Sequence, residues 1–227
     1  MGIVDVIRDH EGEAITMELV PLGNLGDHLL GVDQLRLMGK QMLEAIHHLH
    51  AMHIVHRDIK PSNILIVSLD PEWVKLSDFG IAAKRTSDLT TFCGTPKYAA
   101  PEIFKRWYGK EVDVYSLGVT FLDAISVLPD EPGNMSQHDW TKYLRKRAIE
   151  LKASSDPLFL DWIWRMIDPD PGRRLSVKEG LAHAGLLPPG RPSIEPRTPT
   201  EVSFGGPSSP RDGKVLLLKV IGYTYLS

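Results

Sequence analysis

The pattern of apolar positions predicts two helices of different character in the first 130 residues. From Asp33, a suitable N-cap, apolar side chains recur every three or four positions, at Leu35, Met38, Met42, Ile46 and Leu49. This spacing is typical of an amphipathic helix with one buried face. Residues 113–127 are apolar on nearly every face, which predicts a helix that is buried all round.

Shorter apolar runs predict two β-hairpins, over residues 3–7 with 14–20 and over residues 64–67 with 74–76. The second hairpin would bring Asn63 and Asp78, at its open end, side by side. Further helices are expected at about residues 136–152, at 157–167 and from Ser176, where Ser176 and Glu179 have the spacing of a capping box.

The composition changes after about residue 187. The stretch from Pro188 onward is rich in Pro, Ser, Gly and Thr, which bury too little apolar surface to order a chain, so we expect it to be disordered. Residues 215–221 at its end are apolar but too few to span a bilayer. This run could be an extra strand, a docking segment or the product of a faulty gene model. We favour the last, because the run shows no packing role.

Composition narrows the class of protein. A chain of 227 residues suffices for one domain and a tail. The net charge of −3 excludes a strongly basic surface for nucleic acid. The single cysteine, Cys93, excludes an internal disulfide framework and fits a reducing compartment. No apolar run is long enough for a membrane span, and the N-terminus lacks the features of a signal peptide. We therefore expect an intracellular protein, cytoplasmic or nuclear, without nucleic-acid or membrane partners.

Residues 56–63 read His-Arg-Asp-Ile-Lys-Pro-Ser-Asn and carry the strongest chemical signal. Phosphoryl transfer to a hydroxyl needs a carboxylate that takes the proton, a cation that offsets phosphoryl charge, and an oxygen that ligates Mg²⁺. Asp58, Lys60 and Asn63 supply these groups within six residues. A chance match to five fixed positions has odds of about 1 in 10,000 if residues are drawn evenly.

Two more motifs follow in order. Residues 78–80 read Asp-Phe-Gly, and residues 94–102 read Gly-Thr-Pro-Lys-Tyr-Ala-Ala-Pro-Glu. With them, residues 13–187 resemble the catalytic core of a eukaryotic Ser/Thr protein kinase: its catalytic loop, its magnesium loop and the end of its activation segment. A weaker similarity points to calcium/calmodulin-dependent or checkpoint-type kinases.

The resemblance implies an α+β, protein-kinase-like fold with a mostly helical large lobe and only a remnant β-hairpin of the small lobe. Residues 1–22 would form this remnant and the hinge, residues 23–187 the large lobe, and residues 188–227 the disordered tail.

The resemblance also implies roles for single residues. Asp58 would take the proton of the substrate hydroxyl, and Lys60 would reach the γ-phosphate. Asn63 and Asp78 would hold Mg²⁺ through oxygen. Thr95 would bond to Asp58 and Lys60 and mark a site for Ser or Thr substrates.

Adenine would be held near the hinge. The resemblance implies main-chain hydrogen bonds from Glu18 and Val20, with Met17 as the gatekeeper and Leu65 as the apolar floor of the pocket. Asn24 stands where many kinases place an acidic residue for the ribose, so that contact stays open.

Other residues would support or regulate this site. Arg57 would pair with a phosphate that an upstream kinase places on Thr91; alternatively, Thr91 is an ordinary exposed loop residue. Glu102 and Arg174 would form a buried ion pair, and Asp113 would accept backbone hydrogen bonds from the catalytic loop.

The implied function is an ATP- and Mg²⁺-dependent protein serine/threonine kinase acting on Ser or Thr hydroxyls of protein substrates. The chain contains no Gly-x-Gly-x-x-Gly, and nothing before residue 17 resembles the strand that carries the ATP-binding lysine. We therefore expect the small lobe to be missing and the polypeptide to be inactive alone. The alternative is a non-catalytic, pseudokinase-like interaction module.

Overall fold

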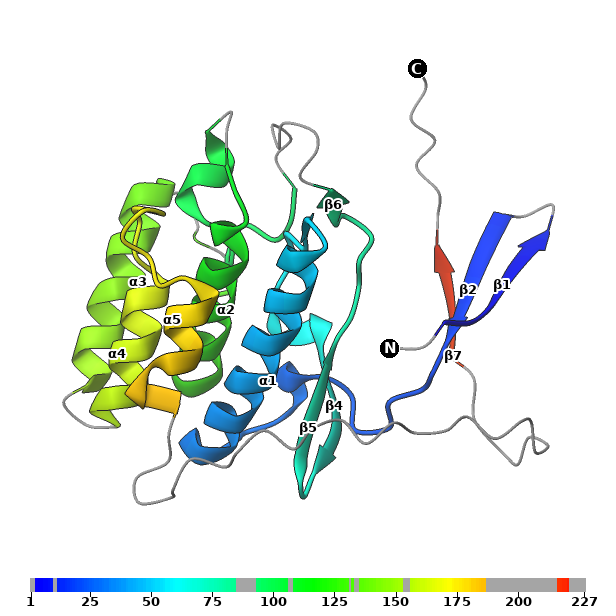
Figure 1. The fold of residues 1–227 in the computed structure, drawn as a ribbon, viewed down its shortest axis with the longest axis horizontal. Coiled ribbons are helices and arrows are strands. Elements are labelled where there is room, and N and C mark those ends of the chain that lie inside the picture. The colour runs from blue at the N-terminus through cyan, green and yellow to red at the C-terminus, as the bar shows by residue number, and fades with distance from the viewer. Residues whose placement is uncertain are drawn as a thin grey trace. The chain divides into compact units, whose positions relative to one another are not determined.

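The computed structural model describes residues 3–9, 12–84, 93–105, 108–130, 132, 135–152, 156–186 and 216–220. The chain divides into two compact units. One consists of Met1–Pro21 with Pro192–Ser227, and the other consists of Leu22–Arg191. The larger unit holds the five α-helices of the described residues and all three sequence motifs (Figure 1).

Helix α1, Val32–Ala51, forms as its apolar periodicity predicts. Its five periodic apolar residues are all buried. The predicted N-cap is wrong, because Gly31 takes this position and the Gln34 side chain accepts a hydrogen bond from the Gly31 N–H at 3.1 Å. Asp33 lies inside the first turn, where its carboxylate is 2.7 Å from the buried Arg36 guanidinium. The Asp33 carboxylate thus pairs with Arg36 and does not cap the helix N-terminus.

Helix α2, Glu111–Ser126, is the buried helix that the second apolar pattern predicts. Residues 112–122 are buried without exception. A glycine allows this helix to approach α4, Pro157–Met166: a Cβ atom on Gly118 would lie 2.8 Å from the Met166 Cβ. Val127 ends α2 in the left-handed conformation, with φ of 48°.

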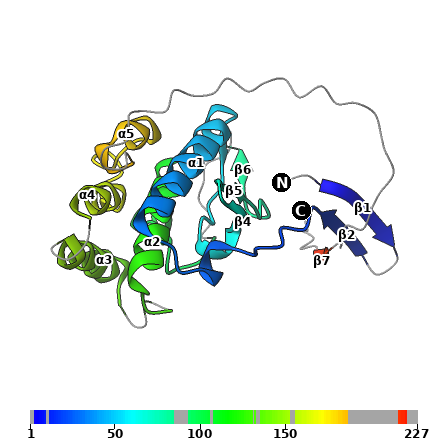
Figure 2. The same ribbon diagram turned by 90° about the horizontal axis from the view of Figure 1, so that it is seen from below.

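Three more helices form a row along one side of α1 and α2 (Figure 2). They are α3, Gln137–Lys152, α4, and α5, Val177–Ala182. The rings of Phe121, Phe159 and Trp162 meet between α2 and α4, with centroids 5.5–6.3 Å apart. The Trp162 indole also donates to the Gly180 carbonyl at 3.1 Å, which ties α4 to α5.

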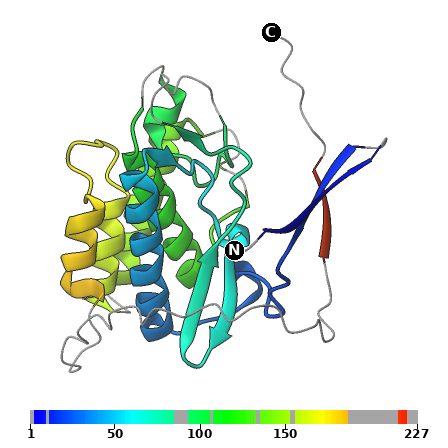
Figure 3. The same ribbon diagram turned by 45° about the vertical axis from the view of Figure 1, so that its right-hand side comes forward.

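A β-hairpin lies against the other side of α1 (Figures 2 and 3). It consists of β4, Ile64–Leu69, and β5, Glu72–Leu76, in antiparallel register with Ile64 opposite Leu76. Gln41 of α1 fastens it, because its amide donates to the Glu72 carbonyl at 2.8 Å and accepts from the Val74 N–H at 3.1 Å.

Short elements complete the larger unit. Strands β3, Ile54–Val55, and β6, Ala83–Lys84, pair with each other. Single 3₁₀ turns cover Leu25–Asp27, Pro61–Asn63, Pro101–Phe104 and Ala184–Leu186. Among the residues that the structure describes, no helix combines the length and apolar character needed to cross a membrane.

The smaller unit contains one antiparallel sheet with strand order β1-β2-β7. Strand β1 is Ile3–Asp9, and β2 is Gly12–Met17, which ends three residues earlier than the sequence predicted. Strand β7, Leu216–Val220, lies in the apolar run near the C-terminus, so the structure has the extra strand among the three interpretations of that run. The other tail residues predicted to be disordered, 188–215 and 221–227, lie outside the described residues.

Candidate active site

The loop of residues 56–63 is anchored on α2. The fully buried Asp113 carboxylate accepts the backbone N–H groups of His56 at 3.0 Å and Arg57 at 2.9 Å, as the sequence predicted. The sequence did not reveal that His50 Nε2 also lies 2.8 Å from the same carboxylate. Its helical position gave a signal, because His50 follows Ile46 by four residues and therefore shares the buried face of α1.

Four donors surround the Asp58 carboxylate. Thr95 donates to Oδ1 from its backbone N–H at 3.1 Å and from its hydroxyl at 2.9 Å. The Lys60 ammonium lies 2.8 Å from Oδ2, and the Asn63 amide donates to Oδ2 at 3.1 Å. An ionised carboxylate has about four acceptor positions, so this network holds Asp58 in one orientation.

Lys60 bridges the two ends of this network, because its ammonium also donates to the Thr95 hydroxyl at 2.9 Å. The Lys60 side chain is 24% exposed and the Asp58 side chain 11%. The cluster therefore combines a held carboxylate with a cation that solvent reaches.

Gly94 allows Thr95 to reach the loop. Its φ of +94° is a conformation that residues with a Cβ rarely adopt. A Cβ atom there would also lie 2.5 Å from the Arg57 carbonyl oxygen. The close approach of these two backbone segments thus requires glycine.

Asn63 and Asp78 lie at the open end of the β4–β5 hairpin. They are not directly opposite each other, because the pairing is shifted by one residue from the prediction. The partner of Asn63 is Ser77, whose N–H and hydroxyl donate to the Asn63 carbonyl at 2.9 and 3.0 Å. The Asn63 amide nitrogen donates to the Asp58 carbonyl at 2.8 Å, which leaves the amide oxygen as the atom able to ligate a cation. Asp78 is exposed and has φ of +61°.

This donor set fits Mg²⁺. A hard cation prefers oxygen ligands, and the Asn63 amide and the Asp78 carboxylate both offer them. The Asp78 carboxylate accepts the Gly80 N–H at 3.2 Å, which orients it. His56, buried beneath the loop, lies with its ring 4.9 Å from the Phe79 ring and its Nε2 atom 3.0 Å from the Ser77 carbonyl oxygen.

Arg57 has backbone and tyrosine partners. Its guanidinium donates to the Ile81 carbonyl, at 2.6 Å from Nε, and to the Tyr108 hydroxyl at 3.4 Å. Thr91, the predicted phosphate-bearing partner, lies outside the described residues. The pairing of Arg57 with a phosphate therefore stays a prediction.

The predicted ion pair between Glu102 and Arg174 is present and buried, with two contacts of 2.5 and 3.0 Å. Arg174 also donates to the carbonyls of Asp168 at 3.0 Å and Glu111 at 2.9 Å. It thereby joins the turn Pro101–Phe104 to the start of α2 and to the segment before α5.

Lys97 is a further buried cation, two residues after Thr95, and it was not predicted from the sequence. The Lys97 ammonium lies 2.9 Å from the Asp123 carboxylate and 3.2 Å from the Leu128 carbonyl oxygen. Tyr98 donates to the same carboxylate at 2.7 Å; burial and this acidic partner raise the pKa of the Tyr98 hydroxyl. A lone lysine in a loop carries no periodic signal that would predict its burial.

The residues predicted to contact adenine and ribose are divided between the two units, with Asn24 and Leu65 in the larger one. Leu65 is half-buried and forms a backbone bridge with Asn24. The Asn24 side chain caps the turn Leu25–Asp27, accepting from the Gly26 N–H at 2.9 Å and donating to the Asp27 carboxylate at 2.6 Å. Glu18 and Val20 belong to the smaller unit, so their contacts with adenine stay predictions.

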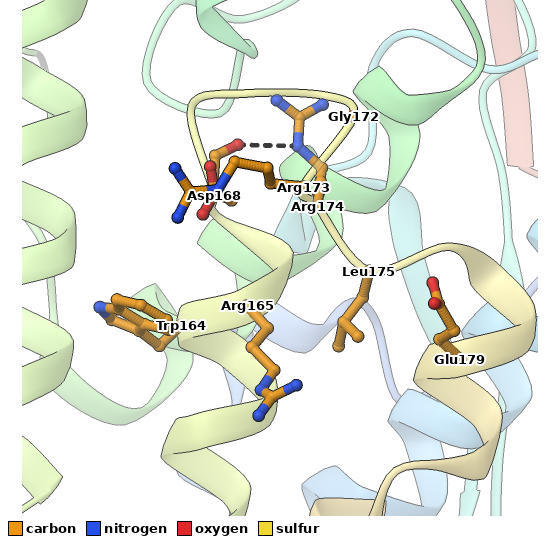
Figure 4. A pocket seen from close by; sticks show the side chains of 8 residues that line it. All are labelled: Trp164, Arg165, Asp168, Gly172, Arg173, Arg174, Leu175 and Glu179. Carbon is orange, nitrogen blue, oxygen red and sulfur yellow. Dashed lines mark hydrogen bonds between the residues drawn. The ribbon is translucent and has the colours of Figure 1, made fainter.

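A cavity of about 280 Å³ lies elsewhere, between α4 and the segment before α5 (Figure 4). Trp164 and Leu175 line it together with Arg165 and Arg173. Arg174 also lines it, but its guanidinium is committed to Glu102. The cavity shares no lining residue with the cluster around Asp58 and is not part of the candidate active site.

Comparison with known proteins agrees with this geometry. A family model described as a protein kinase domain matches residues 1–185. Maternal embryonic leucine zipper kinase of Xenopus tropicalis is 32% identical over 185 residues, which cover 76% of this chain and 28% of the relative. Mitosis inducer protein kinase cdr1 of Schizosaccharomyces pombe is 31% identical over 196 residues, covering 82% and 33%.

Aurora kinase of Schizosaccharomyces pombe is 39% identical over 152 residues, which cover 65% of this chain and 41% of the relative. The chain thus spans about a third of the length of these curated relatives. The matched region includes the catalytic loop, the Asp-Phe-Gly motif and the Glu102–Arg174 pair. The predicted α+β, protein-kinase-like fold is confirmed, and the chain belongs to the protein kinase domain family.

Proposed function

We propose that this chain carries the acceptor side of a protein serine/threonine kinase site, which transfers the γ-phosphate of ATP to Ser or Thr hydroxyls of protein substrates. The observation that carries the proposal is the Asp58 carboxylate, which holds a hydroxyl at 2.9 Å and an ammonium at 2.8 Å at the same time. A hydroxyl to be deprotonated and a cation to offset phosphoryl charge are what this transfer needs.

Asp58 acts as the base in this proposal. It accepts the hydrogen bond of the incoming hydroxyl and takes its proton late in the transfer. Because four donors already fill the carboxylate, the incoming hydroxyl has to displace one of them. Thr95 Oγ1 is itself a hydroxyl in this position, which supports a site for the hydroxyl of a Ser or Thr acceptor.

Asn63 and Asp78 would hold Mg²⁺ through their side-chain oxygens. When bound, MgATP supplies the phosphoryl group that is transferred. Lys60 would offset the charge of that group, because its ammonium is partly exposed and is held by Asp58. Glu18, Val20 and Leu65 would hold adenine, as the resemblance implies.

We also propose that the 227-residue polypeptide does not transfer phosphate by itself. It lacks a glycine-rich phosphate loop and a lysine strand before the hinge. Transfer depends almost wholly on positioning and electrostatics, so losing the groups on one side of the phosphates should abolish it. Protein substrates and an upstream kinase acting on Thr91 are the partners that the proposal names.

A chimera tests the kinase chemistry of the site. Residues 1–16 are replaced by the small lobe of the Schizosaccharomyces pombe Aurora kinase, joined directly before Met17. Transfer from ATP labelled at the γ-phosphate to a mixed Ser, Thr and Tyr peptide is then measured. We expect phosphoserine and phosphothreonine, and a fall of at least about 100-fold with Asp58→Asn.

Asp70→Asn is the matched control, because Asp70 is an exposed carboxylate in the turn between β4 and β5; this variant should retain activity. A chimera that unfolds cooperatively and binds MgATP, yet transfers no phosphate, would reject the proposal. That result would favour the non-catalytic interaction module.

A further inference from the structure

The cavity beside α4 lies outside the candidate active site, and the kinase chemistry gives it no task. Figure 4 shows its walls, which come from the end of α4, the loop that follows and the start of α5. An engineered apolar cavity of about 150 Å³ holds benzene. A cavity of about 280 Å³ therefore has room for a whole side chain of another molecule.

Two half-buried side chains, Trp164 and Leu175, give the cavity an apolar wall. Both pack against the hydrophobic core. The Trp164 ring is also covered by the Arg145 guanidinium, whose central carbon lies 3.8 Å from the ring centroid. The Leu175 N–H donates to the Arg165 carbonyl at 3.3 Å. The wall is therefore held in place before a ligand arrives, which lowers the entropy cost of binding.

The two acidic residues that line the cavity are engaged by their own chain. The Asp168 carboxylate accepts the Asp170 N–H at 3.0 Å and lies 3.4 Å from the Arg145 guanidinium. The Glu179 carboxylate accepts the Ser176 N–H at 2.8 Å and the Ser176 hydroxyl at 2.7 Å. Because these hydrogen bonds belong to the fold, the acids are poorly placed to bind a cationic ligand.

The basic residue Arg165 keeps donors for a ligand. Its Nε atom lies 3.0 Å from the Asp161 carboxylate, but Lys152 and His183 also contact that carboxylate, at 3.1 and 3.3 Å. The two terminal nitrogens of Arg165 donate no hydrogen bond within the part of the chain that the structure describes. More than half of the side chain is exposed, so an anion in solution can reach these nitrogens.

Arg173 is the least engaged cation at the cavity. Its side chain is exposed and makes no hydrogen bond or ion pair with any described residue. Burial lowers the pKa of the nearby Arg145, and the charge of Arg173 lowers it further, against the opposing effect of Asp168. Two like charges thus lie near each other, and an added anion would relieve their repulsion.

We propose that this cavity docks an acidic peptide segment of a partner protein. One apolar side chain of the segment enters beside Trp164 and Leu175. Carboxylates before and after it accept hydrogen bonds from Arg165 and Arg173, because guanidinium groups bind carboxylates in a two-pronged geometry. Figure 4 shows these two guanidinium groups well apart, so a single carboxylate would not serve both. This inference does not rest on the proposed function, since the cavity shares no lining residue with the Asp58 cluster.

Fluorescence anisotropy tests the docking with the full 227-residue chain. The probe is a fluorescein-labelled peptide, Gly-Ser-Glu-Glu-Leu-Glu-Glu-Ser-Gly. We expect saturable binding with a Kd below about 1 mM, which weakens as salt is added. A peptide with glutamine in place of every glutamate should bind at least ten times more weakly. A peptide with glycine in place of the leucine should bind several times more weakly.

Charge reversals in the protein locate the binding. Arg173→Glu and Arg165→Glu should each weaken binding of the leucine-containing acidic peptide at least tenfold. Lys40→Glu makes the same change in charge at an exposed position of α1 that does not line the cavity, and it should alter the Kd less than twofold. Because Arg173 has no partner in the described fold, Arg173→Glu should leave the urea midpoint unchanged.

Three results would overturn the proposal. The first is no saturable binding of the acidic peptide up to 1 mM. The second is equal affinity for the acidic and the glutamine peptides. The third is an equal loss of affinity in Arg173→Glu and Lys40→Glu, which would assign the binding to the overall charge of the protein.

Discussion

At Asp58 a single carboxylate accepts hydrogen bonds or an ion pair from three residues, two of which, Lys60 and Asn63, lie within five positions of it. These two could be read from the sequence because the motif is local. Thr95, 37 positions away, was expected only through the family resemblance. Lys97 and its partner Asp123 were not found at all, since no spacing rule joins a loop lysine to the far end of a helix.

Gly94 should be required for the stability of the fold. Gly94→Ala should destabilise the fold by about 1–3 kcal/mol, because alanine is strained at positive φ and its Cβ would meet the Arg57 carbonyl. Gly172→Ala is the control, since a Cβ there meets only the Asp170 carboxylate at an ordinary 3.4 Å. Urea unfolding of both variants checks the difference; similar midpoints would contradict it.

The buried ion pair between Glu102 and Arg174 should also be required for the stability of the fold. Glu102→Ala should lower the free energy of unfolding by about 3–5 kcal/mol, because the buried Arg174 charge loses its partner. Glu150→Ala breaks surface pairs with Lys146 and Arg147 and should change it by at most about 1 kcal/mol. Thermal unfolding measures both, and a small loss at Glu102 would show that the pair is not needed for stability.

Apolar patterns predicted α1 and α2, and the capping box of Ser176 and Glu179 predicted the start of α5. The ends of the other helices depend on side-chain partners that such patterns do not reveal. Helix α1 begins at Val32 with Gly31 as its N-cap, and Asp33 in its first turn pairs with Arg36. That arginine also donates to the Gly185 carbonyl at 2.9 Å and contacts Asp156, the N-cap of α4. One buried guanidinium thus joins three segments, and such long-range pairing cannot be read from local sequence.

The contribution of Asp156 to the free energy of unfolding should depend on pH. Burial by itself would raise the pKa of its carboxyl, but hydrogen bonds from Phe159 and Arg36 outweigh it and lower the pKa. A carboxyl with a lowered folded-state pKa stabilises the fold above its unfolded pKa of about 3.9 and loses this effect as pH falls through the folded value. Asp156→Ala should therefore cost about 1–2 kcal/mol at pH 7.

The cost of Asp156→Ala should shrink as pH falls below about 4, because the carboxyl of the unfolded chain is protonated first and that of the folded chain only at lower pH. Denaturant unfolding at several pH values measures this dependence. Asp70→Ala provides the reference, because it removes an exposed carboxylate. A cost that stays constant down to pH 2 would show that Asp156 acts without its charge.

The chain consists of a helical unit that holds the catalytic loop and a small sheet built from both ends of the sequence. The helical unit was predictable because its motifs and periodic patterns are local. The pairing of β7 with β2 was not, since strand partners so distant in sequence leave no local trace. Only the apolar character of the run around Leu216–Val220 hints at a strand.

We propose that this polypeptide holds the acceptor side of a kinase site and needs further protein on the ATP-phosphate side. The most direct test is γ-phosphate transfer by the purified 227-residue chain, with MgATP and a Ser/Thr peptide, beside its Asp58→Asn variant. We expect no transfer above background from either protein. Transfer by the unmodified chain that Asp58→Asn abolishes would contradict it.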